Sequence, residues 1–115
     1  EETLQAIETR TRKAGGEVVG LLGFGSAFVS PAWAALEMAE AIIFDKRKII
    51  PVCAKLEGEY GVDGLFVGVP AIVGKNGVEE IIELDLTDGE KEALGVSVNA
   101  VSKTCAEADD LLAKI

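Results

Sequence analysis

The side chains that most enzymes use for proton transfer are scarce or scattered in this 115-residue chain. It contains no histidine, so it offers no imidazole for acid–base catalysis near neutral pH. Its two cysteines, Cys53 and Cys105, lie far apart, without neighbouring ligands at a metal-binding spacing. These residues therefore predict no complete catalytic site and no metal site.

Two other groups of charged residues have a chemical and a structural interpretation. Glu57 and Glu59 could form an acid–base pair, but they lie in a glycine-bearing turn region where no apolar pocket is implied. The run Asp45–Lys48 could bind an anion, but cations at the end of a helix also stabilise its dipole. The pattern favours the structural interpretation for both groups.

The segment Gly74–Gly77 is not a phosphate loop, because no Lys-Ser/Thr pair opens a helix after it.

Composition limits the possible partners. A net charge of −9 argues against a nucleic-acid or anionic-membrane surface, since both need Lys and Arg to neutralise phosphate. Apolar residues make up 49% of the chain, as in a globular protein of one domain rather than a disordered one. Cys53 and Cys105 occupy apolar-patterned positions, and with no visible signal or transit peptide we expect reduced core thiols in a cytoplasmic protein.

The most hydrophobic stretch is residues 23–44, a glycine loop followed by a helix. Ser30 is expected to cap this helix and Pro31 to be its first residue. The helix is apolar on nearly every side, so it should be buried in a core or against a partner subunit. Trp33 and Met38 are expected in the core, and the segment is too short and too charged at its edges to span a membrane.

The remaining pattern predicts a helix, three strands and a final helix. The first helix covers residues 4–22, with a Glu8–Arg12 pair and a kink at Gly15-Gly16. Strands are expected over residues 48–56, 65–74 and 78–86.

Local signals refine the strands and the final helix. The first strand should be covered on both faces, with Pro51 on an edge or at a bulge, and Asn76-Gly77 should form a hairpin turn. Thr87 and Glu90 should form a capping box before the last helix. Its apolar stripe should pack on the sheet, and its members are Leu94, Val98, Val101, Cys105, Ala108 and Leu112. Sequential strands joined by turns pair antiparallel, so the fold class is α+β.

Several motifs in fixed order then resemble one family. Residues 11–19 (TRKAGGEVV), followed by Gly25-Ser26-Ala27, are similar to the helix and substrate-side loop of malate dehydrogenases built like lactate dehydrogenase. Residues 56–61 (LEGEYG) and 68–79 (GVPAIVGKNGVE) resemble that family's three-strand region. The resemblance covers essentially all of residues 1–115. It implies the carboxy-terminal, substrate-side α+β domain of the lactate/malate dehydrogenases, with an antiparallel sheet of about three strands packed with long helices.

The resemblance also implies an activity and its partners. The whole enzyme would interconvert L-malate and oxaloacetate by hydride transfer to or from NAD, act on a small 2-hydroxy or 2-oxo dicarboxylate, and form a homodimer or homotetramer. The Rossmann domain that binds most of the dinucleotide, with its Gly-x-Gly-x-x-Gly turn, is absent from these residues, as are the catalytic histidine and the substrate-binding arginines. We therefore expect residues 1–115 alone to be inactive.

Three residues take site roles from the resemblance. Ser26 and Ala27 would line the substrate pocket, and Pro31 would lie against the nicotinamide ring. Lactate dehydrogenases tend to have threonine at the place of Ala27, so alanine favours malate dehydrogenase. Two alternatives stay open: the corresponding domain of an L-lactate dehydrogenase, and a non-catalytic oligomerisation module with the same fold.

Overall fold

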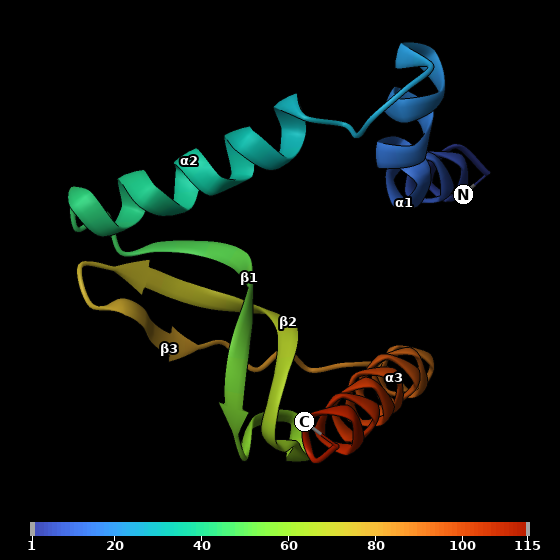
Figure 1. Ribbon diagram of the computed structural model, residues 1–115. Helices are drawn as coiled ribbons and strands as arrows, with labels where there is room; N and C mark the ends of the chain where they lie inside the picture. The colour runs from blue at the N-terminus through green and yellow to red at the C-terminus, as the bar shows by residue number, and fades with distance from the viewer. Residues whose placement is uncertain (1, 115) are drawn as a thin grey trace. The chain divides into compact units, whose positions relative to one another are not determined.

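The computed structural model describes residues 2–114 (Figure 1). Its elements follow the order α1 (Glu2–Leu22), α2 (Val29–Ile43), β1 (Lys48–Glu57), η1 (Glu59–Gly61), β2 (Asp63–Gly74), β3 (Gly77–Ile81) and α3 (Asp88–Leu112). The strands form one antiparallel sheet in the order β1-β2-β3. This architecture confirms the predicted α+β class. The chain divides into two compact units, one ending at Ala39 and the other beginning at Glu40.

The apolar core of the second unit lies on one face of the sheet. The inward positions of β1 and β2 alternate as predicted, and opposite partners in the register, such as Val52 and Val69, are both buried. Leu56 has no exposed surface. Partly buried side chains from η1, β3 and α3 pack against this core, as does Ala41 near the end of α2. The buried members are Ala41, Ile50, Val52, Ala54, Leu56, Val67, Val69, Ala71 and Val73.

The opposite face of the sheet is open in the part of the chain that the structure describes. Ile49 is 60% exposed, and Phe66 and Val78 are exposed as well. The prediction that β1 is covered on both faces is therefore wrong for residues 2–114. Cys53 lies on this open face and Cys105 on an exposed side of α3, and both are free thiols. They are unpaired, as expected, but the prediction that they belong to the core is wrong.

Pro51 lies on an edge strand, as predicted. β1 pairs only with β2 among the described residues, and Pro51 stands directly opposite Pro70. The carbonyl of Pro70 accepts a hydrogen bond from the N–H of Ile82, on the side away from β1. Neighbouring pairs in an antiparallel ladder alternate between bonded and non-bonded, and two prolines can share only a non-bonded pair. Neither missing N–H is therefore needed between β1 and β2.

The third strand is shorter than predicted. The Asn76-Gly77 turn is present, with Gly77 at a φ of 88°, but β3 ends at Ile81 instead of reaching residue 86. Tyr60 explains the difference, because its side chain and backbone hold the segment that follows. Its hydroxyl donates to the carbonyl of Ile82 at 2.7 Å and accepts from the N–H of Leu84 at 3.0 Å, and its N–H donates to Glu83 at 2.7 Å. These bonds replace strand pairing beyond Ile82, whose N–H still donates to the carbonyl of Pro70.

Removing the Tyr60 hydroxyl is expected to destabilise the second unit. In Tyr60→Phe the carbonyl of Ile82 and the N–H of Leu84 both lose this partner, which should lower the free energy of unfolding by about 1–3 kcal/mol. Urea unfolding followed by circular dichroism measures the change. An unchanged midpoint would mean that the two bonds do not hold residues 82–86.

The final helix follows its predicted boundaries closely. The Thr87 hydroxyl accepts from the N–H of Glu90 at 3.4 Å, and the Glu90 carboxylate accepts from the N–H of Thr87 at 2.8 Å. This confirms the capping box. The Thr87 hydroxyl also donates to the Glu90 carboxylate at 2.7 Å, and this bond holds the pKa of Glu90 below its usual value. Leu94 and Val98 pack against the core as expected. Only the first part of the apolar stripe packs on the sheet, because Cys105 and Leu112, further along the helix, are exposed.

The first unit contains α1 and most of α2. α1 runs through Gly15 and Gly16 as one continuous helix, so it is not split there, while a kink of its axis at the two glycines stays a prediction. None of its described residues is buried. Each internal glycine costs about 1 kcal/mol relative to alanine, yet a Cβ at either position would meet no atom within 4 Å. Nothing within the described residues therefore requires glycine at these two positions.

Most of α2 is exposed, although its composition is that of a buried helix. Ala41 is its only buried residue among those described, while Trp33 is 68% exposed and Met38 is also exposed. The prediction that Trp33 and Met38 lie in a core is wrong for this chain. The alternative prediction, burial against a partner subunit, stays open. No helix in residues 2–114 is long and apolar enough to cross a membrane.

Candidate functional site

The predicted site residues lie on the loop that joins α1 to α2. Gly23 and Gly25 adopt left-handed φ angles of 77° and 78°, which glycine adopts without strain. A Cβ on Gly25 would also lie 2.6 Å from the ring of Phe28. Gly25 is therefore required both by its φ angle and by the aromatic ring that covers it. This ring contact gives the loop a defined shape.

Ser26 and Phe28 determine how the loop enters α2. The Ser26 hydroxyl accepts the N–H of Phe28 at 3.2 Å. The carbonyl of Phe28 accepts from the N–H of Ala32 at 3.1 Å, so the helix begins two residues earlier than expected, at Val29. The prediction that Ser30 caps the helix is wrong, because Ser30 already lies within the first turn. Pro31 is the third helical residue, where a backbone N–H has no partner within the helix.

The three predicted site residues therefore share one short segment. Ser26 and Pro31 are exposed and Ala27 is half-buried. No charged side chain occurs between Gly23 and Pro31. This segment can supply shape, one hydroxyl and apolar contact, but it contains no group that could transfer a proton at neutral pH.

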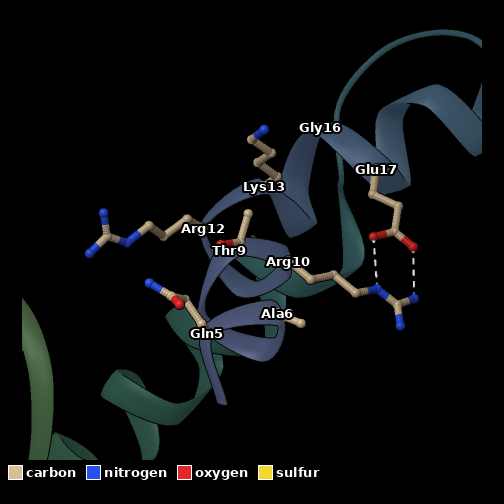
Figure 2. Close-up of a pocket in the computed structure, with 8 residues that line it drawn as sticks. All are labelled: Gln5, Ala6, Thr9, Arg10, Arg12, Lys13, Gly16 and Glu17. Carbon is tan, nitrogen blue, oxygen red and sulfur yellow. Dashed lines mark hydrogen bonds and ion pairs between the residues drawn. The ribbon is translucent and has the colours of Figure 1, made fainter. Parts of the chain in front are cut away.

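A large open groove of about 1010 Å³ lies along α1 (Figure 2). All eight lining residues belong to this one helix. Arg10 forms a two-point ion pair with Glu17, with Nε–Oε2 and Nη2–Oε1 distances of 3.0 and 2.8 Å. These hydrogen bonds lower the pKa of Glu17 and raise that of Arg10. On the same helix, the predicted Glu8–Arg12 pair is confirmed at 2.6 Å. Because both arginines of the groove are already paired with glutamates, we do not assign the groove as an anion-binding site.

The two turn carboxylates are part of the backbone structure. The Glu59 carboxylate accepts the N–H of Glu57 at 2.7 Å, and this bond lowers the pKa of Glu59. A carboxylate held in the ionised form is a poor general acid, which agrees with the structural interpretation of this pair. Across residues 2–114, no group of three or more His, Cys, Asp or Glu side chains is placed to hold a metal ion.

Comparison with known proteins identifies the class of domain. Residues 1–111 match the family described as lactate/malate dehydrogenase, alpha/beta C-terminal domain. The chain belongs to this family.

Among its relatives, the malate dehydrogenases are most informative. The chain is 59% identical to malate dehydrogenase of Bacillus cereus over 100 residues, covering 87% of this chain and 32% of the relative. It is 55% identical over 104 residues to malate dehydrogenase 1 of Anaeromyxobacter dehalogenans, covering 90% and 33%. The chain thus spans about a third of the length of these relatives.

Solved structures agree with the fold. Malate dehydrogenase from Salinibacter ruber superposes with a TM-score of 0.92 at 43% identity, covering 99% of this chain and 37% of that one. Lactate dehydrogenase from Eimeria maxima with NADH and oxamate gives a TM-score of 0.90 at 39% identity, covering 97% and 35%. This confirms the expected lactate/malate dehydrogenase C-terminal fold.

Proposed function

We propose that this chain is the carboxy-terminal, substrate-side domain of an NAD-dependent malate dehydrogenase. The observation that carries the proposal is the 55–59% identity to malate dehydrogenases over nearly the whole chain. The enzyme would reduce oxaloacetate to L-malate with NADH and catalyse the reverse reaction, in the cytoplasm. The catalytic acid, the substrate-binding arginines and the dinucleotide-binding Rossmann domain would be supplied by residues outside this sequence.

Within that enzyme, the chain would contribute one wall of the active site. When bound, NAD would accept the hydride from malate, and NADH would donate it to oxaloacetate in the reverse direction. Residues 1–115 fit only the edge of that cofactor, because they include no Gly-x-Gly-x-x-Gly turn for its phosphates. Pro31, exposed in the first turn of α2, would present an apolar surface to the nicotinamide. Such a wall would exclude water and orient the reactants without transferring a proton itself.

Ser26 and Ala27 would line the substrate part of the same wall. Ala27 is half-buried beside the Gly25–Phe28 contact, so its methyl group is held in a loop of defined shape. Threonine there would add a hydroxyl and fill space next to the substrate. Alanine would leave that space to the second carboxylate of a dicarboxylate, as a malate dehydrogenase needs.

The experiment is Ala27→Thr in the enzyme that contains this chain. The variant is expected to lower kcat/KM for oxaloacetate relative to pyruvate by about tenfold, the effect of a small change in pocket volume. Steady-state kinetics with both substrates, with Ala27→Ser as the smaller matched change, measures the ratio. If the ratio stays constant, Ala27 does not line the pocket; if the parent enzyme prefers pyruvate, the lactate dehydrogenase alternative is favoured.

The exposed apolar surface of α2 favours one additional role, in assembly. Trp33, Leu36 and Ile43 are large apolar residues of α2 with half or more of their surface exposed. Exposed apolar surface of this extent is typical of interfaces. We expect α2 to be covered in a homodimer or homotetramer. Sedimentation of the enzyme tests this, and a stable monomer with α2 exposed would contradict both this role and a separate function as an oligomerisation module.

A further inference from the structure

The aromatic ring of Phe28 folds back over the loop that precedes α2. A Cβ on Gly25 would lie 2.6 Å from Cζ and 2.8 Å from Cε2 of this ring, so the ring lies directly against the backbone of Gly25. Phe28 is also tied to the loop through its backbone, because its N–H donates to the Ser26 hydroxyl at 3.2 Å. These two contacts close residues 25–28 on themselves, with Ala27 in between.

Phe28 adopts a backbone conformation that is unfavourable for phenylalanine. Its φ angle is 39°, in the left-handed region, where a residue with a Cβ is strained. Such a conformation persists only where the surroundings hold it. Here they include the ring contact with Gly25, the bond to Ser26 and the bond from the N–H of Ala32 to the Phe28 carbonyl. One of these contacts requires an aromatic ring at position 28.

Gly23 separates the ring contact from the requirement for a left-handed backbone. Gly23 and Gly25 have φ angles of 77° and 78°, so a side chain would be strained to the same extent at both positions. A Cβ on Gly23 meets no atom within 4 Å, whereas one on Gly25 meets the ring of Phe28. Only at Gly25 would a side chain both strain the backbone and displace the ring.

We propose that Phe28 is a positioning residue that sets substrate preference by holding Ala27 in place. This inference rests on the proposed function, in which the methyl group of Ala27 borders the space for the second carboxylate of the substrate. Ala27 is half-buried and lies within the segment closed by the Gly25–Phe28 contact. Carbon atoms in contact need about 3.5–4.0 Å, so a Cβ at 2.6 Å from the ring would displace the ring or the loop by roughly 1 Å. Errors of about 1 Å can cost a hundredfold in rate.

The expected consequence is a changed substrate ratio and not a uniform loss of activity. Oxaloacetate would place its second carboxylate beside Ala27, where pyruvate has only a methyl group. A displaced Ala27 should therefore impair the reduction of oxaloacetate more than that of pyruvate. Loss of stability alone would reduce the amount of folded enzyme and lower both rates by the same factor. The ratio of the two kcat/KM values thus distinguishes positioning from a merely structural role.

The test compares Gly25→Ala with Gly23→Ala in the complete enzyme, below the unfolding midpoint of each variant. Both substitutions introduce a Cβ at nearly the same φ angle, and only the one at Gly25 meets the ring. Steady-state kinetics with both substrates is expected to show that Gly25→Ala lowers the ratio of kcat/KM for oxaloacetate to that for pyruvate at least about tenfold. Gly23→Ala should leave the ratio unchanged. The same ratio in both variants would overturn the proposal.

Phe28→Ala and Phe24→Ala form a second matched pair, which also guards against misfolding of Gly25→Ala. Both remove an exposed phenyl ring from the same loop, and only Phe28→Ala is expected to lower the ratio. In the double variant Gly25→Ala/Phe28→Ala the new Cβ no longer meets a ring, so its ratio should equal that of Phe28→Ala alone. If the two single effects multiply instead, Gly25 does not act through Phe28 and the proposal is wrong.

One readout keeps this inference separate from the proposed function. If the parent enzyme does not reduce oxaloacetate, the proposed function fails. Hydrogen exchange still tests the role of Phe28, because the amides of residues 28 and 32 are bonded to Ser26 and to the Phe28 carbonyl. Both amides should exchange faster in Phe28→Ala and Gly25→Ala than in the two control variants. Equal exchange in all four variants would mean that the ring does not hold the loop.

Discussion

A polypeptide of residues 1–115 alone is expected to show no NADH-dependent reduction of oxaloacetate. The reaction needs a proton donor, substrate-binding cations and the cofactor held together in one geometry. These residues contain no histidine and no dinucleotide-binding turn, and the loop from Gly23 to Pro31 contains no charged side chain. The expected loss is therefore complete, measured by the absorbance of NADH during incubation with oxaloacetate.

A mixing experiment is the matched control. The amino-terminal two thirds of a relative, such as malate dehydrogenase of Bacillus cereus, would be tested alone and together with residues 1–115. Activity that appears only in the mixture would support the division of labour proposed for the two parts. Sustained turnover by residues 1–115 alone would contradict it, because no imidazole is available there.

Replacing Leu56 by alanine is expected to have the largest effect on stability. Leu56 has no exposed surface and lies at the end of β1 in the core of the second unit. The substitution removes buried apolar contact and leaves a cavity, so it should lower the free energy of unfolding by about 2–5 kcal/mol. Urea unfolding followed by circular dichroism measures this change.

Ile49→Ala provides the control on the same strand. Ile49 faces the open side of the sheet and is 60% exposed. Its truncation should cost about 1 kcal/mol or less, since little buried surface is lost. Equal losses for the two variants would mean that both faces of β1 are covered in solution.

The class of fold and the order of its elements were predictable because they follow from local patterns. Alternating apolar residues in β1 and β2, the Asn76-Gly77 turn and the Thr87–Glu90 capping box each act over a few residues. All three appear in the structure as predicted. Local sequence was sufficient here because neighbouring residues make the deciding contacts.

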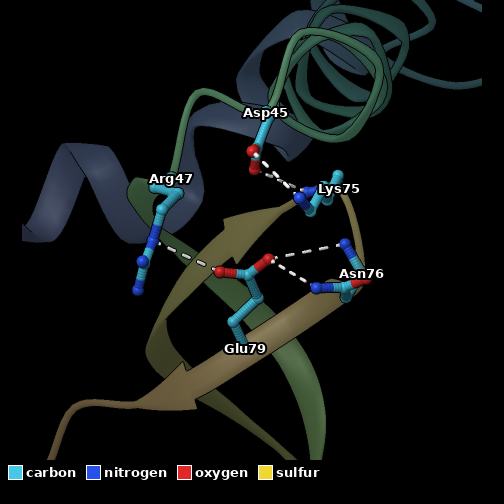
Figure 3. Close-up of polar contacts among 5 residues, drawn as sticks. All are labelled: Asp45, Arg47, Lys75, Asn76 and Glu79. Carbon is cyan, nitrogen blue, oxygen red and sulfur yellow. Dashed lines mark hydrogen bonds and ion pairs between the residues drawn. The ribbon is translucent and has the colours of Figure 1, made fainter.

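The wrong predictions concern places where the structure depends on contacts between residues that are far apart in the sequence. β3 ends early because Tyr60 binds the backbone of residues that follow it by more than twenty positions. The hydrogen bond from the N–H of Lys75 to the carboxylate of Asp45 (Figure 3) escapes prediction for the same reason, since the two residues are thirty positions apart. Nothing in the periodicity of either segment indicates such pairs.

The helix α2 illustrates a different limit. Its composition correctly indicates that apolar surface needs covering, but composition does not say what covers it. The prediction therefore places Trp33 in a core that the described residues do not provide. The site residues Ser26, Ala27 and Pro31 came from the family resemblance, and their roles remain predictions that the Ala27→Thr experiment addresses.

The two facing prolines of the sheet have a consequence for solubility. Because the Pro51–Pro70 pair is non-bonded, the backbone nitrogen of Pro51 points toward the free side of β1 and carries no hydrogen. An incoming strand from another molecule would find one donor missing near the middle of that free side. Edge strands with an interrupted donor row resist the edge-to-edge growth that leads to aggregates and fibrils. Pro51 thus protects a sheet whose outer face is rich in apolar side chains.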